Sequence, residues 1–247
     1  MKQKIHHHIH SARTNPDYGK ILLLRTFGNF LVLASLFMIA KTFYLPVKEE
    51  IAYFINKNID KQYVVAQTVD EEASLNSQLE QTNQPKGLLA NVLQIKPVEV
   101  LAPQDPNYSI IIPKIGANSR ITTTGVSEEK DYLDVLKTGV AHAQGTSFPG
   151  ESGHIFLFAH STDYFWNVGA YNAIFYLLYK LEPQDEVDLF YQGQRYVYRV
   201  TGKEIIDPSQ VEYLTKKTDR EFLTLQTCWP PGTTLKRMLV FAERVVE

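Results

Sequence analysis

The chain is poor in cysteine and in clustered positive charge. Cys228 is the only cysteine among 247 residues, so an intrachain disulfide framework is excluded and the thiol is either buried, bridged to another chain or reactive. After the first 25 residues no cluster of Lys and Arg occurs, and the net charge is only −2. A nucleic-acid partner is therefore not expected, because binding a phosphate backbone requires a basic surface.

A long apolar run is present near the N-terminus. Residues 26–40 carry no charge and lie between Arg25 and Lys41. Together with their apolar neighbours they predict a transmembrane anchor over residues 21–45, since this length crosses a bilayer when both charged side chains snorkel to the interfaces. The preceding Lys and Arg residues predict that residues 1–20 form a cytoplasmic tail and that everything after Leu45 lies outside. A cleaved signal peptide and a buried core helix are the alternatives.

Residues 46–94 are predicted to separate the anchor from the folded domain. Apolar residues recur at helical spacing between Val47 and Ile59, which predicts that the helix continues beyond the membrane. Residues 67–84 are polar and acidic, and this composition indicates a linker or a weak solvated helix.

Residues 95–247 have the pattern of an all-β domain. Short runs rich in β-branched and aromatic residues are separated by Pro, Gly, Asp and Asn. The predicted strands are 108–115, 154–159, 186–192, 195–206, 221–228 and 237–246, with a hairpin turn around Gly193. Helical patterns cover residues 131–137 and 170–180. The sequence therefore predicts one β-barrel or sandwich of about 150 residues with small helices on its rim.

Three side chains at predicted strand ends are candidates for chemistry. Cys228 and His160 each end an apolar strand, and Arg237 begins another. If these strands are neighbours, one rim of the sheet brings a thiol, an imidazole and a guanidinium together. A cysteine nucleophile requires a thiolate, which we expect a positive setting to favour. His142, in a predicted loop, and His154, at a strand start, are weaker candidates, and a lone cysteine is also commonly a small buried hydrophobe.

The residues around these positions resemble the sortases, which are membrane-anchored cysteine transpeptidases of bacterial cell surfaces. The sequence Thr-Leu-Gln-Thr-Cys at residues 224–228 is similar to the family motif Thr-Leu-x-Thr-Cys, and Arg-Met-Leu-Val from Arg237 resembles the strand with its essential Arg. Residues 145–161 resemble the segment that leads to the catalytic His, and residues 110–121 resemble the opening strand. Many sortases have Gly where this chain has Ala159.

The resemblance implies a closed eight-stranded barrel with short rim helices. His160, Cys228 and Arg237 would be catalytic, and Thr227 would line the substrate groove. The implied reaction cleaves a Leu-Pro-x-Thr-Gly-like sorting signal through a thioester on Cys228 and transfers the Thr carboxyl to an amine. The implied partners are surface proteins with a C-terminal sorting signal, an amine acceptor from a cell-wall peptide or a pilin Lys, and the lipid bilayer. The sortase subclass stays open.

No cofactor is expected. Some sortases bind calcium through carboxylates in loops, but Glu151, Asp207 and Glu212 show no metal-ligand spacing, so no metal site is predicted and calcium dependence stays open. Asp163 follows His160 closely and either orients its ring or forms a turn.

Three alternatives compete with the sortase interpretation. An L,D-transpeptidase also uses Cys, His and Arg, but its motif places Ser-His-Gly before the nucleophile. A caspase-like protease would match Gln226 and Cys228, yet that fold needs long helices alternating with parallel strands. A membrane-anchored β-domain that binds a surface partner would leave Cys228 buried and inert, whereas an enzyme needs an accessible, acidic thiol.

Overall fold

The computed structural model describes residues 17–81, 98–126, 129–161, 173–215 and 218–245. The chain forms two compact units, Met1–Lys48 and Glu49–Glu247, which divide inside helix α2 (Tyr18–Asn58).

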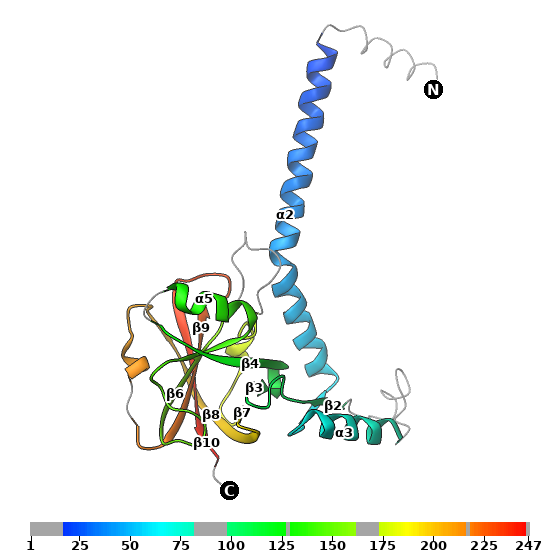
Figure 1. Cartoon of the computed structure of the whole chain (residues 1–247). Coiled ribbons are helices and arrows are strands. Elements are labelled where there is room, and N and C mark those ends of the chain that lie inside the picture. Colours follow the sequence, from blue (N-terminus) through cyan, green and yellow to red (C-terminus); the bar gives the residue numbers. More distant parts are fainter. Residues whose placement is uncertain (1–16, 82–97, 127–128, 162–172, 216–217, 246–247) are drawn as a thin grey trace. The chain divides into compact units, whose positions relative to one another are not determined.

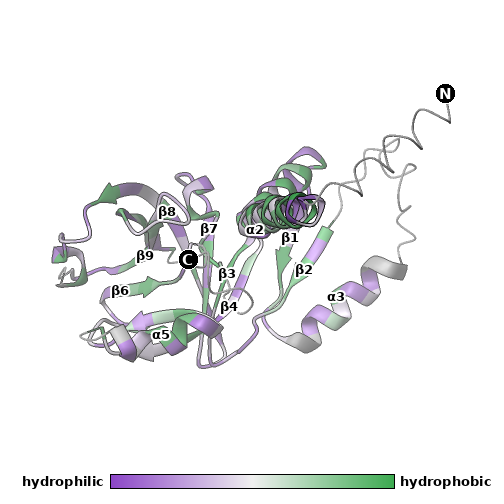
Figure 2. Cartoon of the chain, turned by 90° about the horizontal axis from the view of Figure 1, so that it is seen from above, coloured by the Kyte–Doolittle hydropathy of each residue, from purple (hydrophilic) through white to green (hydrophobic). Residues whose placement is uncertain are grey.

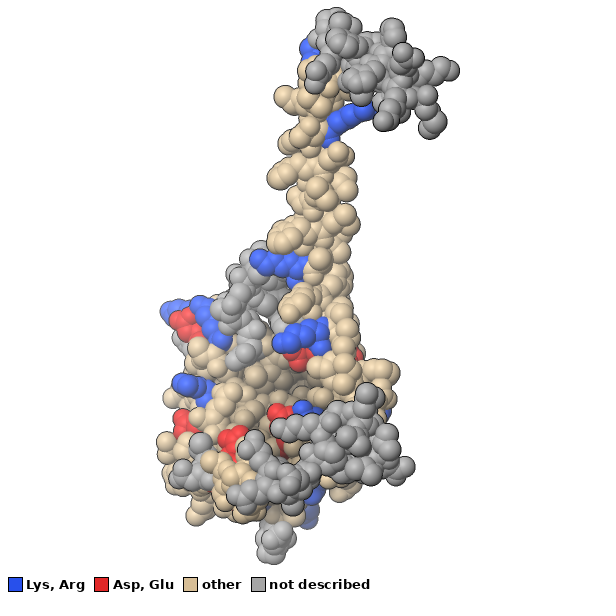
Figure 3. All heavy atoms as spheres, turned by 90° about the vertical axis from the view of Figure 1, so that its right-hand side faces the viewer, with Lys and Arg blue, Asp and Glu red and all other residues tan. Residues whose placement is uncertain are grey.

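The described part of the first unit is the apolar portion of α2. Within the described residues, one helical stretch, Tyr18–Tyr44, is long and apolar enough by length and composition to cross a membrane, and its side chains are exposed. Figure 2 shows apolar residues along this helix, and Figure 3 shows an uncharged surface between basic side chains. The hydroxyls of Thr26, Ser35 and Thr42 donate to carbonyls four residues earlier, at 2.9, 2.8 and 2.8 Å, which satisfies them within the helix.

The second unit is built around a closed barrel of eight strands, ordered β10-β8-β7-β3-β4-β5-β6-β9 (Figure 1). The strands are β3 (Tyr108–Ile112), β4 (Ala117–Thr124), β5 (Val140–Ala143), β6 (Gly153–Phe158), β7 (Glu186–Tyr191), β8 (Gln194–Ile206), β9 (Glu221–Trp229) and β10 (Lys236–Arg244). Neighbouring strands are antiparallel except for the parallel pairs β4–β5 and β6–β9. The predicted closed eight-stranded barrel is therefore confirmed.

Strand β6 is buried on both of its faces. Ile155 and Leu157 belong to the cluster that fills the barrel. Phe156 and Phe158 belong to a second cluster, which packs on the outside of the barrel with Leu136 of α5 (Glu129–Thr138). The continuous apolar run in this strand is explained by burial on alternate sides.

The hairpin predicted around Gly193 joins β7 to β8. Tyr191 pairs with Gln194, and the two residues between them, Gln192 and Gly193, have φ values of 51° and 77°. Positive φ at both central residues is typical of a type I′ turn, which matches the right-handed twist of the paired strands.

A small parallel sheet precedes the barrel in the chain. It pairs β1 (Gln62–Val65) with β2 (Val98–Leu101). Helix α3 (Val69–Gln81) follows β1 and realises the helical alternative for the polar segment 67–84. At its start the Thr68 hydroxyl accepts a hydrogen bond from the Glu71 amide at 3.1 Å, which caps the first turn.

The structure differs from the sequence prediction in several strands and in one helix. Strands β1, β2, β4 and β5 are absent from the prediction, because β4 is largely polar and the other three have only four residues each. The helix predicted over 170–180 is wrong for its described part, where residues 174–177 form turns and only the 3-10 helix η2 (Leu178–Lys180) is present. Phe175, Leu178 and Leu181 of this segment pack into the barrel core, which overrides the local helical pattern.

Candidate active site

Strands β6, β9 and β10 bring His160, Cys228 and Arg237 into one row. Arg237 is the Cα partner of Cys228 in the β9–β10 pair. In the parallel β6–β9 pair Phe158 lies opposite Gln226, and the Ala159 amide donates to the Gln226 carbonyl at 3.1 Å. Continuing this register by two residues places His160 level with Cys228. The three residues therefore lie side by side on adjacent segments at one rim of the barrel.

The row lines a cavity of about 270 Å³ on the outside of the barrel. Its polar part contains His160, Cys228, Arg237 and Thr227, and its apolar part is formed by Tyr132, Leu133, Leu136, Phe156, Phe158 and Leu214. Cys228 is partly exposed and lines this cavity. Two larger cavities of about 540 and 660 Å³ are lined by none of the three residues in the row, so chemistry rather than volume identifies the candidate site.

Burial dominates the protonation of the thiol and the imidazole. Burial raises the pKa of Cys228 above 9.0, and the positive charge of Arg237 opposes this shift in part. Burial also lowers the pKa of His160 below 6.5. At neutral pH the resting pair is therefore a neutral thiol beside a neutral imidazole. The expectation that a positive setting would ionise the resting thiol is not met, because desolvation outweighs the effect of Arg237.

Arg237 is held by backbone carbonyls of the β9–β10 loop and of the first residue of β10. Its Nη1 donates to the carbonyls of Thr234 and Lys236, both at 3.1 Å. A guanidinium carries five N–H groups, and no further hydrogen bond from Arg237 to a described residue is formed. The remaining donors are available to a ligand in the cavity, while the two carbonyls fix the orientation of the planar group.

Thr227 holds the backbone at Ala159, the residue before His160. Its side chain is 4% exposed, and its hydroxyl donates to the Ala159 carbonyl at 2.9 Å. Since successive residues of a strand point to opposite faces, Thr227 and Cys228 lie on different sides of β9. The hydrogen bond ties β9 to the residue that precedes His160.

The other sequence candidates lie elsewhere or outside the described residues. His142 is fully buried, and His154 shares a hydrogen bond with the Thr224 hydroxyl at 2.8 Å. Asp163 lies outside the described residues. Sequence reasoning missed the apolar floor made by Phe156 and Phe158. The unbroken apolar run at residues 155–159 was the available signal, since a strand apolar at every position is buried on both faces.

The carboxylates considered for calcium have other partners. Glu151 accepts a hydrogen bond from the Phe148 amide at 2.9 Å, and Asp207 pairs with Lys236 at 2.7 Å. No group of three or more His, Cys, Asp or Glu residues able to hold a metal ion occurs in the described parts of the chain.

Comparison with known proteins identifies relatives. Sortase D of Bacillus subtilis (strain 168) is 28% identical over 137 residues, which cover 54% of this chain and 61% of that protein. Sortase A from Corynebacterium diphtheriae, a lid mutant, is 25% identical with a TM-score of 0.48, over 58% of this chain and 72% of that one. Sortase C from Clostridium perfringens SM101 is 31% identical with a TM-score of 0.45, over 56% and 69%.

The chain spans less than two thirds of the length of the Bacillus relative. The Sortase domain family model matches residues 110–245, a range that includes the whole row of His160, Cys228 and Arg237. The matched range is more than half of the 247 residues, and the chain therefore belongs to the sortase family.

Proposed function

We propose that this chain is a cysteine transpeptidase that cleaves a Leu-Pro-x-Thr-Gly-like sorting signal and joins the Thr carboxyl to an amine. The observation that carries the proposal is the row of His160, Cys228 and Arg237 along one cavity in a chain of the sortase family. The thiol supplies a nucleophile, the imidazole moves protons, and the guanidinium supplies fixed positive charge.

In the first half of the reaction a thioester forms. His160 takes the proton from the Cys228 sulfur, and the thiolate attacks the carbonyl carbon of the substrate Thr. Arg237 donates hydrogen bonds to the oxyanion that develops on that carbonyl, where they stabilise the transition state more than the ground state. As the tetrahedral intermediate collapses, the His160 imidazolium gives its proton to the departing amine of the next residue.

In the second half the acyl group moves to an acceptor. An amine attacks the thioester carbonyl, and His160, now neutral, takes a proton from the attacking nitrogen. Collapse of the second intermediate releases the Cys228 thiolate, which recovers its proton from His160. A partly enclosed site favours an amine over water only if the acceptor is well positioned.

The apolar floor of the cavity suits the Leu-Pro portion of the substrate. Phe156, Phe158 and Leu136 provide apolar surface beside the row. Leu214, from the connection between β8 and β9, lines the same cavity. An extended peptide would place apolar side chains there and its Thr carbonyl at Cys228. Thr227 supports this geometry by holding the backbone at Ala159.

We further propose that α2 anchors the enzyme in the cell membrane with its N-terminus in the cytoplasm and the barrel outside. The apolar stretch Tyr18–Tyr44 is long enough to span, and the Lys and Arg residues that precede it favour this orientation. The substrates are then surface proteins with a C-terminal sorting signal, and the acceptor amine comes from a cell-wall peptide or a pilin Lys.

The test uses the full chain in detergent micelles with fluorogenic Leu-Pro-x-Thr-Gly peptides and either triglycine or a Lys peptide as acceptor. We expect cleavage, transfer of the Thr carboxyl to the amine, and an acyl adduct on Cys228 by mass spectrometry. Cys228→Ala is the control and should release no product. Absence of cleavage with every peptide, together with a thiol that iodoacetamide labels only after denaturation, would favour a non-catalytic binding domain.

A further inference from the structure

One segment of the barrel unit, residues 173–181, contacts both strand ends of the candidate active site. The Phe175 amide donates to the His160 carbonyl at 3.3 Å, and the Phe175 side chain is fully buried in the barrel core. The ring of Tyr179 packs against the ring of Trp229, with 5.4 Å between centroids, and Trp229 directly follows Cys228. Residues 173–181, the bracing segment, therefore link the backbone of His160 to Trp229, the residue next to Cys228.

The same segment is bound by the last turns of helix α2. The Tyr179 hydroxyl donates to the Glu50 carboxylate, and Lys180 forms an ion pair with Glu50 at 3.2 Å. The Lys180 ammonium also lies 5.2 Å from the centroid of the Tyr53 ring, a favourable cation–π distance. Glu50 and Tyr53 belong to the same compact unit as the barrel. Two helix residues thus make three polar contacts with two neighbouring residues of the bracing segment.

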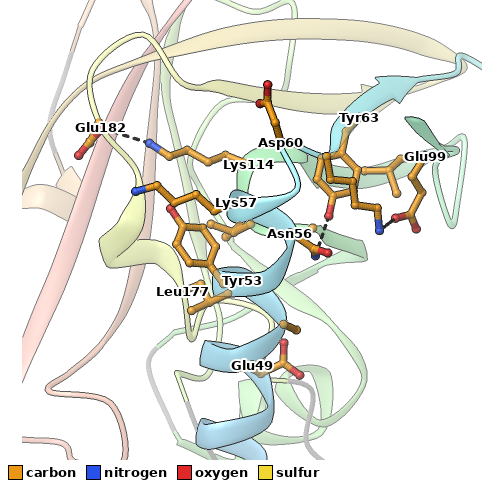
Figure 4. A pocket seen from close by; sticks show the side chains of 15 residues that line it. Glu49, Tyr53, Asn56, Lys57, Asp60, Tyr63, Glu99, Lys114, Leu177 and Glu182 are labelled. Carbon is orange, nitrogen blue, oxygen red and sulfur yellow. Dashed lines mark hydrogen bonds and ion pairs between the residues drawn. The ribbon is translucent and has the colours of Figure 1, made fainter. Parts of the chain in front are cut away.

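Apolar and backbone contacts complete this connection. Tyr53 and Leu177 line one cavity between the helix and the barrel (Figure 4). From the other side, the Lys203 ammonium donates to the carbonyls of Tyr179 and Leu181, at 2.6 and 2.8 Å. The bracing segment is therefore held both from the helix and from strand β8.

The Tyr179 hydroxyl remains a donor at physiological pH. Burial, followed by the hydrogen bond to Glu50, raises the pKa of Tyr179 to about 12. A phenol hydrogen bonded to a carboxylate is a charge-assisted interaction and is stronger than a neutral one. A helix that only provided reach from the membrane would not need such a contact with the residue that packs on Trp229.

We propose that Glu50 and Tyr53 of α2 are positioning residues for the active site, because they hold the bracing segment that sets the placement of His160 and of Trp229 beside Cys228. The catalytic unit then begins within the juxtamembrane helix rather than at the first strand of the barrel. This inference rests on the proposed function for its kinetic consequence, although the structural link itself is independent of the substrate.

The first experiment follows the link to Trp229 by fluorescence. The chain has two tryptophans, Trp166 and Trp229, so the Trp166→Phe full chain in detergent reports on Trp229 alone. In this background we expect Glu50→Ala and Tyr179→Phe to shift the Trp229 emission to longer wavelength, because the indole becomes more hydrated. Asn56→Ala is the matched control: it removes a hydrogen bond of the same helix to the Tyr63 hydroxyl at 3.2 Å and should leave the emission unchanged.

The second experiment separates positioning from stability. Glu50→Ala should lower kcat by about tenfold per folded chain, with the folded fraction measured by circular dichroism and KM for the sorting peptide within about twofold of wild type, since misplacement of catalytic groups acts on the chemical step. Glu50→Gln keeps an acceptor for the Tyr179 hydroxyl and should restore most of kcat. A variant that only unfolds part of the population would lower the folded fraction and leave kcat per folded chain constant.

The two proposals fail in different ways. If peptides are not turned over even by wild type, the proposed function fails, and the rate of Cys228 alkylation by iodoacetamide then tests the positioning role. We expect that rate to change by at least about threefold in Glu50→Ala, because local exposure and thiolate fraction both set it. Unchanged Trp229 emission in Glu50→Ala, or unchanged alkylation and kcat per folded chain, would overturn the positioning role.

Discussion

Two histidines of the same barrel have pKa values lowered by burial, yet their surroundings differ. His142 is fully buried on β5, and a ring nitrogen lies 2.7 Å from the Thr146 hydroxyl. Its ring packs edge-on against Tyr108 and Phe148. His160 lies beyond the end of β6 and lines a cavity together with a thiol. Burial of a histidine therefore does not identify a candidate base, whereas a position beside a thiol in the same open cavity makes His160 the candidate.

The largest expected effect comes from replacing each of the two histidines in turn. His160→Ala should lower kcat/KM for the sorting peptide by about a thousandfold, because general acid–base catalysis is lost. His142→Gln, which keeps a hydrogen-bonding side chain, should leave kcat/KM per folded chain unchanged. Both variants are assayed with the peptide and amine pair, with circular dichroism as the folding control. Equal losses in the two variants would contradict the assignment of roles.

Arg237 supplies a positive charge in the cavity that His160 lines. Arg237→Lys should lower kcat/KM by about a hundredfold, since an ammonium does not reproduce the fixed donor fork of the guanidinium.

The pH dependence of the two Arg237 variants sharpens this test. The acid limb of kcat/KM follows His160 and should lie below pH 6.5, and the alkaline limb follows Cys228 and should lie above pH 9.0. Arg237 lowers the pKa of the thiol, so Arg237→Ala should move the alkaline limb to higher pH. Arg237→Lys keeps the charge and should shift this limb less. An alkaline limb at the same pH in wild type and Arg237→Ala would show that Arg237 does not act on the thiol.

His142 should affect stability rather than rate. Burial lowers its pKa to about 4 in the folded chain, from 6.5, so the unfolded chain binds the extra proton between these values. Its contribution to the free energy of unfolding is therefore intact above pH 6.5 and falls by about 3 kcal/mol as the pH drops to 4. Urea unfolding at several pH values should show this loss for wild type and a smaller one for His142→Gln. Identical pH profiles would mean that His142 does not titrate as its burial indicates.

The smallest expected effect concerns Thr227. Thr227→Val removes the hydrogen bond to the Ala159 carbonyl and should cost about 1 kcal/mol of stability, with a severalfold loss of kcat through displacement of His160. Thr227→Ser keeps the hydroxyl and should retain most of both quantities. Chemical unfolding and steady-state kinetics of the pair provide the measurement. A Thr227→Val variant as active as wild type would show that the Thr227 hydroxyl does not help to position His160.

Local sequence patterns predicted most strands but not the pieces whose conformation depends on packing. Strands β7 and β9 are rich in apolar residues that alternate along much of their length. The glycine at position 193 is typical of a hairpin turn. The polar strand β4 has no such pattern. It forms because pairing with β3 and β5 stabilises it. The described part of the predicted helix 170–180 forms turns and the 3-10 helix η2 instead, because the barrel core takes up Phe175 and Leu178.

The sequence by itself determined the apolar span of α2, the all-β character of the domain, and the placement of Cys228, His160 and Arg237 at strand ends, since these depend on local composition and periodicity. Only the tertiary structure decided that β6 pairs with β9 and β9 with β10, that burial keeps the resting thiol and imidazole neutral, and that Glu50 reaches the segment next to Trp229. Strand register arises from barrel closure, whereas desolvation and the Glu50 contact arise from packing of other segments against the barrel. Both join residues far apart in the chain and leave no local pattern to detect.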